Sequence, residues 1–287
     1  MKLILGTVQF GLEYGINNSI GKASREEIFK ILNKAYELNI RDLDTSDLYG
    51  DALEVLEDYS SEFGDKFNIM SKFILENESE TIIGHLNESL KRLSSTSIEG
   101  YSFHRFNDYK KLKNLNEISQ ELKSQGLIKK IGVSLYSNEE LEIAINDPAV
   151  DTIQLPFNLF DSDPKKIALL EMAKKLKKEI HVRSIFLQGI FYMDINQLTG
   201  NLISFKPALE SLHAIRNSEG LSVEDLCFGF VNSFDCIDGI VFGVDTIEQL
   251  DRNLMSAQKN VSEKIKEKIL EINNYEKGLL NPSKWEK

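Results

Sequence analysis

The sequence predicts a (β/α)8 barrel of parallel strands that spans residues 1–287 as one domain. Short apolar runs alternate eight times with longer amphipathic stretches, which is the element order that such a barrel requires. The 287 residues are 41% hydrophobic, enough for one large core, and no Pro/Gly-rich linker divides them. An open doubly wound sheet is the competing class, but no G-x-G-x-x-G turn follows the first run.

The apolar runs are too short for helices and are rich in Val, Ile and Phe. That composition is typical of parallel strands that are buried on both faces. In chain order, the expected strands cover residues 2–10, 40–46, 67–73, 97–105, 129–136, 150–158, 180–188 and 237–244.

The amphipathic stretches repeat apolar residues with the helical period, for example at Ile28, Ile31, Leu32 and Ala35. The barrel helices are expected over residues 25–38, 51–63, 80–93, 109–126, 138–147, 164–179, 206–220 and 246–260. Two further helices are expected outside the repeat. One covers 222–234, inserted before the last strand, and the other covers 261–277 and closes the C-terminus.

Charge and composition limit the partners. The net charge of -11 argues against nucleic acid or an anionic membrane as the main partner, because both require a basic surface. The N-terminus is too short and polar for a signal peptide, and no window of about 18 apolar residues occurs. Cys227 and Cys236 match no metal-ligand spacing, and the four histidines are scattered, so we expect packing cysteines and no metal. These observations predict a cytoplasmic protein whose oligomeric state stays open.

Polar residues stand at the carboxyl ends of three successive predicted strands, where barrel enzymes carry their chemistry. Asp44 ends the second strand and Tyr49 lies in the loop after it. Lys72 ends the third strand and His104 the fourth, and each interrupts an otherwise apolar run. A buried lysine and a buried carboxylate are each unfavourable alone and tolerable as a pair, so we expect Lys72 to face Asp44.

These four residue types together suit proton transfer to a carbonyl oxygen. A tyrosine hydroxyl ordinarily ionises near pH 10, and a neighbouring ammonium stabilises its phenolate, so Tyr49 beside Lys72 is a candidate general acid. His104 is placed to polarise a carbonyl group. No side chain can supply hydride, so the reductant must be a nicotinamide, NADPH or NADH, and the substrate a small-molecule carbonyl compound.

Six ordered motifs then resemble the aldo-keto reductase superfamily over nearly the whole chain. They are "DLDTSDLYG" (its D-T-A-x-x-Y-G motif), "MSKF" (S-T-K), "FHR", "GLIKKIGVSLY", "IQLPFNLFD" and "VFGVDTIEQLDRNL". The resemblance implies a catalytic tetrad of Asp44, Tyr49, Lys72 and His104, and an extended NAD(P)H. It implies that Ser134 and Gln154 hold the nicotinamide carboxamide. The further cofactor-binding candidates are Gly6, Thr7, Arg183, Ser184, Gly243, Asp245, Gln249 and Asn253.

Three positions depart from the family pattern. Leu135 replaces an asparagine that follows the carboxamide serine. Arg183 replaces an aromatic residue that stacks on the nicotinamide, and its charge would disfavour the cationic oxidised ring. Asp245 stands where a basic residue often meets the 2′-phosphate of NADPH, which argues against strict NADPH preference. The helix N-terminus near Thr246 and, farther on, Arg252 still offer an anion some support.

Alternatives stay open at this point. The chain could be a cofactor-binding regulatory or structural member with little turnover, or an unrelated barrel hydrolase that uses the carboxylates of Asp42 and Asp44. The substrate is expected to be set by loops, including residues 186–201 with Phe191 and Tyr192 as pocket-lining side chains. Arg105 and Arg183 suit an anionic or polyhydroxyl substrate, and a sugar or nucleotide-sugar carbonyl from bacterial polysaccharide biosynthesis is the specific hypothesis.

Overall fold

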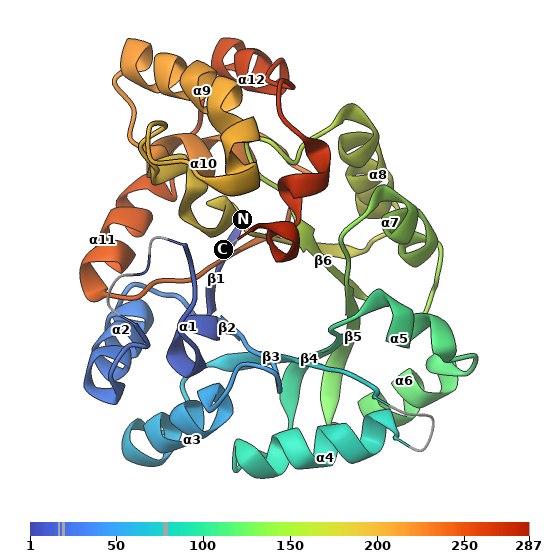
Figure 1. Ribbon diagram of the computed structural model, residues 1–287. Coiled ribbons are helices and arrows are strands. Elements are labelled where there is room, and N and C mark those ends of the chain that lie inside the picture. Colours follow the sequence, from blue (N-terminus) through green and yellow to red (C-terminus); the bar gives the residue numbers. More distant parts are fainter. Residues whose placement is uncertain (17, 19–20, 77–79, 287) are drawn as a thin grey trace.

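Eight parallel strands close into a barrel in the computed structural model, which describes residues 1–16, 18, 21–76 and 80–286 (Figure 1). Neighbours in sequence are neighbours in the barrel, and β8 pairs with β1 to close it. The (β/α)8 prediction is therefore confirmed. The strands are β1 (Lys2–Gly6), β2 (Asp42–Asp44), β3 (Asn68–Phe73), β4 (Ile98–Phe103), β5 (Ile128–Ser134), β6 (Thr152–Pro156), β7 (Glu179–Arg183) and β8 (Gly239–Phe242).

A ring of helices surrounds the barrel in Figure 1. They are α1 (Val8–Gly11), α2 (Arg25–Glu37), α3 (Ala52–Phe63), α4 (Ile82–Arg92), α5 (Phe106–Lys111), α6 (Leu115–Ser124), α7 (Asn138–Ile145), α8 (Pro164–Lys175), α9 (Lys206–Glu219), α10 (Val223–Asn232), α11 (Ile247–Ser256) and α12 (Glu263–Leu270). Short 3-10 helices are η1 (Leu187–Tyr192), η2 (Gly200–Phe205), η3 (Lys277–Leu280) and η4 (Pro282–Lys284).

Side-chain caps explain where several of the helices begin. Ser137 and Ser222 each form a capping box with the third residue of α7 and α10, which satisfies backbone N–H groups that have no partner inside the helix. Thr246 caps α11 by accepting from the backbone N–H of Gln249. The cap sets the helix start, and so the direction in which α11 leaves the barrel rim.

The helix expected over residues 109–126 is wrong as a single element, because the chain is extended at Leu112 and forms α5 and α6 instead. Tertiary contacts hold α5 in its own orientation. The Asp108 carboxylate accepts from the backbone N–H of Leu75, 3.1 Å away, and the Tyr109 hydroxyl donates to Asp147 over 2.8 Å. Leu75 and Asp147 lie 33 and 38 positions away from their partners, so a local sequence pattern does not reveal these contacts.

The closing helix is shorter than predicted. Helix α12 ends at Leu270, and the chain continues in short turns. The Tyr275 ring stacks on Phe160 with centroids 4.9 Å apart, and its hydroxyl donates to the Phe160 carbonyl. The residues between Leu270 and position 277, predicted to continue the helix, instead include a segment that packs on the loop after β6.

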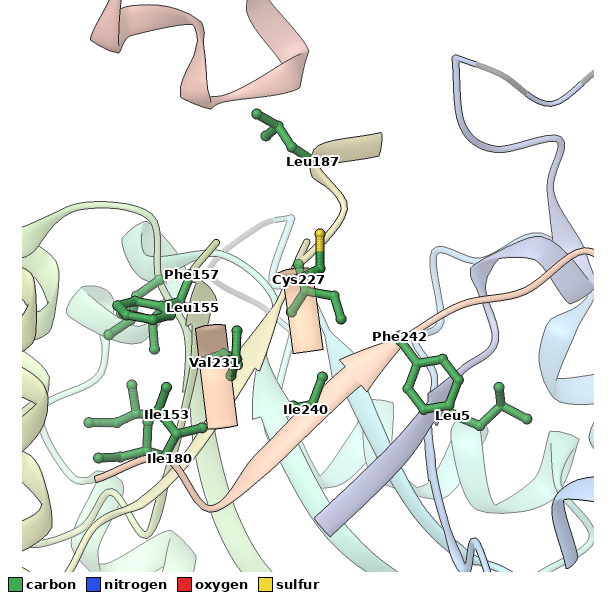
Figure 2. Close-up of a cluster of buried hydrophobic side chains, with 14 of the residues drawn as sticks. Leu5, Ile153, Leu155, Phe157, Ile180, Leu187, Cys227, Val231, Ile240 and Phe242 are labelled. Atoms are coloured by element: carbon green, nitrogen blue, oxygen red, sulfur yellow. The ribbon is translucent and has the colours of Figure 1, made fainter. Parts of the chain in front are cut away.

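Helix α10 packs on α11 and, through Phe228, on Phe242 of β8, and α9 packs on α12. Val223 to Val231 are all buried, as in a helix that is surrounded by protein on every side. Figure 2 shows Cys227 and Val231 of this helix among side chains of β6, β7 and β8. The helix predicted as an insertion therefore belongs to the core, and the cysteines are buried packing residues as expected.

Among the described residues, none of the helices has the length and apolar character needed to span a membrane.

Candidate active site

Three adjacent strands bring the four predicted catalytic residues to one end of the barrel. Asp44 is the last residue of β2, and Lys72 is the second-last residue of β3. His104 directly follows β4, and its backbone N–H donates to the Phe73 carbonyl over 2.8 Å. Because these strands are parallel neighbours, residues near their carboxyl ends meet at the same rim.

Lys72 lies at the centre of this cluster. Its ammonium Nζ is 2.6 Å from Asp44 Oδ2, 2.8 Å from the Thr45 carbonyl oxygen and 3.4 Å from the Tyr49 hydroxyl. Burial lowers the pKa of Lys72, but the Asp44 carboxylate and the Tyr49 hydroxyl outweigh that effect and the net pKa is raised. The lysine is therefore a cation at neutral pH, and it donates to the phenol oxygen.

Two glycine backbones in contact hold the loop that carries Tyr49. A Cβ atom added at Gly11 would lie 1.7 Å from the Tyr49 carbonyl oxygen, and one added at Gly50 would lie 2.4 Å from the Gly11 carbonyl oxygen. Gly50 also has a φ of 57°, in the region that glycine adopts most easily. Any side chain at Gly11 would push this loop away from α1.

His104 faces both Tyr49 and the β2–α3 loop. Its ring lies edge-on to the Tyr49 ring, with centroids 5.9 Å apart and an interplanar angle of 86°. Its Nδ1 atom is 2.8 Å from Ser46 Oγ. Burial, followed by the charges of Lys72 and Arg183, lowers the pKa of His104 to about 3, so the imidazole is neutral at physiological pH.

Gln154 and Ser134 lie beside this cluster on neighbouring strands. They are register partners on β6 and β5, and both are buried. Gln154 Nε2 donates to Asp44 Oδ1 over 2.7 Å, a contact that the sequence did not indicate. Its other polar atom, Oε1, is buried and accepts no hydrogen bond from the described residues. An amide donor such as a nicotinamide carboxamide would satisfy it.

Gly6 at the end of β1 and Thr7 directly after it lie next to Asp44. Gly6 is the register partner of Asp44, and the Thr7 backbone N–H donates to the Asp44 carbonyl over 2.9 Å. Thr7 Oγ1 is a second buried atom without a hydrogen-bond partner among the described residues. Gly6, Thr7 and Gln154 thus lie next to Asp44, with Ser134 beside Gln154.

Arg183 at the end of β7 belongs to this rim. Its guanidinium carbon is 4.4 Å from the Tyr136 ring centroid, and Nη2 donates to the Leu135 carbonyl over 3.3 Å. Its charge also contributes to the low pKa of His104. The side chain is half-buried there, already stacked on an aromatic ring.

The segment after Arg183 has an unusual backbone. Ser184, Leu187 and Gln188 all have positive φ, with values of 59°, 44° and 53°. Such conformations are unfavourable for residues with a side chain and gather at binding sites, where the surrounding structure maintains them. This segment is a candidate for close backbone contact with a ligand.

The predicted adenosine-end residues gather around the start of α11. Gln249 Oε1 accepts from the Asp245 backbone N–H over 2.7 Å, so this side chain braces the loop. Asn253 is buried one turn farther along α11. The Gly243 backbone lies against the side chain of Gln9, since an added Cβ would be 2.2 Å from Gln9 Oε1.

Two groups that the sequence offered to an anion at this helix start already have partners in the structure. The Ile247 N–H does not point at an open site, because Glu27 Oε1 of α2 accepts from it over 3.0 Å. Arg252 pairs with Glu224 of α10 over 3.4 Å. The start of α11 therefore carries two carboxylates, Glu27 and Asp245, with its nearest arginine engaged elsewhere.

Three other expected residues fall outside the cluster. Asp42 accepts from Asn68 Nδ2 over 3.2 Å at the beginning of β3, so it does not pair with Asp44 as a two-carboxylate hydrolase would require. Phe191 is fully buried against Phe160, which corrects the expectation that this side chain lines a pocket. Tyr192 is 44% exposed.

In the part of the chain that the structure describes, His, Cys, Asp and Glu side chains form no group able to hold a metal ion.

The fold and the polar cluster at its rim define a (β/α)8 barrel with a buried ion pair beside a tyrosine and a histidine, and comparison with known proteins identifies the family. Residues 2–274 match the model of the aldo/keto reductase family, and the chain belongs to that family. Among curated proteins, the uncharacterized oxidoreductase YqkF of Bacillus subtilis (strain 168) is 24% identical over 283 residues, covering 88% of this chain and 90% of that protein. The aldo-keto reductase YhdN of the same organism is 26% identical over 162 residues, covering 52% and 49%.

Solved structures agree on the fold. The holo form of aldo-keto reductase AKR11C1 from Bacillus halodurans has a TM-score of 0.77 at 18% identity, covering 96% of this chain and 94% of that one. The glycerol dehydrogenase AKR11B4 from Gluconobacter oxydans has a TM-score of 0.71 at 18% identity, covering 94% and 90%. The protein is thus an oxidoreductase of a family whose members generally use NAD(P)H.

Sequence reasoning missed Ser46, Gly11 and Glu27. A signal existed for Ser46, since this serine stands where the family motif D-T-A-x-x-Y-G has alanine. Gly11 and Glu27 gave no local signal, because their partners Tyr49 and Ile247 lie far along the chain.

Proposed function

We propose that this protein reduces an aldehyde or ketone to an alcohol with a nicotinamide cofactor, and that Tyr49 donates the proton. One observation carries the proposal: Lys72 Nζ contacts both Asp44 Oδ2 and the Tyr49 hydroxyl. A tyrosine held against a buried ammonium can release its proton to a neighbouring oxygen, because the cation stabilises the phenolate that remains.

Each residue of the cluster has a separate task in this proposal. Bound NAD(P)H supplies a hydride to the carbonyl carbon. Tyr49 transfers its hydroxyl proton to the carbonyl oxygen as negative charge develops there. Lys72 stabilises the resulting phenolate, and Asp44 keeps Lys72 in place and charged. Neutral His104 holds the carbonyl oxygen next to the Tyr49 hydroxyl.

The residues around Asp44 fit a nicotinamide ring. Gln154 Oε1 and Thr7 Oγ1 are buried and unsatisfied by the described residues, and Ser134 is adjacent to Gln154. A carboxamide offers both a donor and an acceptor to such groups. We assign Gly6, Thr7, Ser134, Gln154 and Arg183 to the nicotinamide end, Ser184 to the central part, and Gly243, Asp245, Gln249 and Asn253 to the adenosine end.

We further propose that NADH is preferred over NADPH. An additional phosphate at the start of α11 would meet the carboxylates of Glu27 and Asp245, and Glu27 already occupies the Ile247 N–H. Burial raises the pKa of Asp245, which weakens its repulsion of a phosphate. Arg252 is engaged by Glu224. A ribose hydroxyl, in contrast, can donate to a carboxylate.

The substrate proposal rests on the positive charge at the rim. Arg183 and Arg105 both act on His104, in a protein whose overall charge is -11. Tyr136 beneath Arg183 is 47% exposed and offers an aromatic face. These groups suit an anionic or polyhydroxyl carbonyl compound, such as a sugar or nucleotide-sugar carbonyl.

A cofactor-consumption screen over aldehydes, keto sugars and nucleotide-linked keto sugars tests the proposed function. We expect turnover that Tyr49→Phe reduces by about a hundredfold or more, without a change in NADH affinity. Full activity in Tyr49→Phe would refute the proton-donor assignment. Tight NADH binding with no turnover over the whole panel would instead favour a regulatory or structural family member.

A further inference from the structure

Ser46 connects the loop after β2 to the imidazole of His104. Its side chain is 1% exposed, and its Oγ atom lies 2.8 Å from His104 Nδ1 and 3.1 Å from the Lys72 carbonyl oxygen. The Leu48 backbone N–H donates to the same Oγ over 3.2 Å. The Ser46 hydroxyl has only one proton to donate among these three neighbours. The acceptor of that proton therefore determines which ring nitrogen of His104 is protonated.

The proton has two candidate acceptors. If Ser46 donates to the Lys72 carbonyl, His104 must carry its proton on Nδ1 and donate to Ser46. If Ser46 donates to Nδ1, the imidazole must carry its proton on Nε2. The Lys72 carbonyl already accepts from the Asp47 backbone N–H over 3.0 Å, so it is satisfied in both cases. The histidine contact is also the shorter of the two.

We propose that Ser46 donates its hydroxyl proton to His104 Nδ1 and thereby holds the neutral imidazole in the Nε2–H form. The loop supports this hydroxyl independently of His104. The Ser46 carbonyl accepts from the Tyr49 N–H over 3.0 Å, and Asp47 is anchored by the Ser89 hydroxyl over 2.8 Å. Ser46 is therefore a positioning residue for the histidine.

The consequence for catalysis rests on the proposed function. In the Nε2–H form His104 offers a hydrogen-bond donor to a carbonyl oxygen, whereas the other tautomer offers a lone pair that repels it. Protonation does not supply the missing donor at neutral pH, because burial, followed by the charges of Lys72 and Arg183, disfavours the imidazolium. The tautomer must therefore be set by a hydrogen bond.

Nitrogen NMR of protein labelled with 15N-histidine measures the tautomer of His104 directly. The measurement does not require the protein to turn over a substrate. The chain has only four histidines, and a His104→Gln variant assigns the His104 signals. Between about pH 6 and about pH 8 we expect an unprotonated Nδ1 and a protonated Nε2. The Ser46→Ala variant should move these signals towards a mixture of tautomers, and Ser46→Thr should restore them.

Ser71→Ala is the matched control. Ser71 is fully buried next to Lys72, and its Oγ makes no hydrogen bond to the described residues. Its removal should leave the His104 signals and turnover unchanged. In Ser46→Ala we expect kcat to fall about tenfold with the NADH dissociation constant unchanged, less than the loss seen when a carbonyl-binding donor is deleted outright.

A wild-type spectrum with a protonated Nδ1 overturns the inference, and this measurement does not depend on whether any variant folds. Unchanged His104 signals in folded Ser46→Ala overturn it as well. Failure of the proposed function gives a different pattern, in which the tautomer depends on Ser46 but no carbonyl compound is turned over.

Discussion

Lys72 Nζ and Asp44 Oδ2 lie 2.6 Å apart, with side chains that are only 3% and 6% exposed. Two opposite charges at this depth stabilise each other, but each is unfavourable without its partner. Asp44 is also held by Gln154 over 2.7 Å, so the carboxylate is oriented from β6 as well as from β3. The pair thus sets both the position and the charge of the group that contacts Tyr49.

Removal of one partner should therefore destabilise the protein more than removal of both. We expect Lys72→Met or Asp44→Asn alone to lower the free energy of unfolding by about 3–5 kcal/mol, and the double variant to recover part of that loss. Urea unfolding of the four proteins measures the coupling. Strictly additive effects would show that the two charges are not energetically linked.

The contact between Gly11 and the Tyr49 loop gives a second prediction. Gly11→Ala places a methyl group against the Tyr49 carbonyl oxygen, so the loop must move and Tyr49 with it. We expect kcat to fall by about tenfold or more, because proton donors act only within hydrogen-bond reach. Gly278→Ala is the control, since an added Cβ there meets nothing closer than Glu276 Oε1 at 3.6 Å. Equal activity in both variants would contradict the prediction.

Cofactor preference depends on the two carboxylates at the start of α11. We expect Glu27→Gln and Asp245→Asn each to raise the NADPH/NADH ratio of kcat/KM by about tenfold, the equivalent of ~1.4 kcal/mol of removed repulsion. Steady-state kinetics with both cofactors measure the ratio. Glu26→Gln is the matched control, because Glu26 lies next to Glu27 but pairs with Lys30 on the surface. A wild-type enzyme that strongly prefers NADPH would refute the argument.

The buried histidine predicts a pH dependence of stability. Burial lowers the pKa of His104 from 6.5 to about 3, so between these values the unfolded chain binds a proton that the folded protein does not. Stability is therefore lost as the pH falls through this window, by up to about 1.4 kcal/mol per pH unit from this group. Unfolding free energies measured from pH 6.5 downwards should fall less steeply in His104→Gln. Parallel curves for the two proteins would contradict the prediction.

Much of the barrel could be predicted because its signals are local. The period of the apolar residues identifies each strand and the helix that follows it. The alternating order of these units is compatible with only a few chain topologies. Lys72 and His104 were recognisable as candidate site residues because burying a polar side chain at the end of an apolar strand is unfavourable unless it has a partner or a function. Helix ends were harder to predict from the sequence. The break at Leu112, for example, accompanies a hydrogen bond between the Asp108 carboxylate and the distant Leu75 backbone N–H.

The sequence by itself determined the fold class, the eight strands and the four residues proposed for proton transfer. Only the tertiary structure decided how those residues are held. Ser46 meets His104 across 58 positions, Gln154 meets Asp44 across 110, and Glu27 meets Ile247 across 220. The reason is physical: hydrophobic periodicity is a property of neighbouring residues, whereas hydrogen-bond partners at the rim of a closed barrel are brought together only when all eight strands have paired.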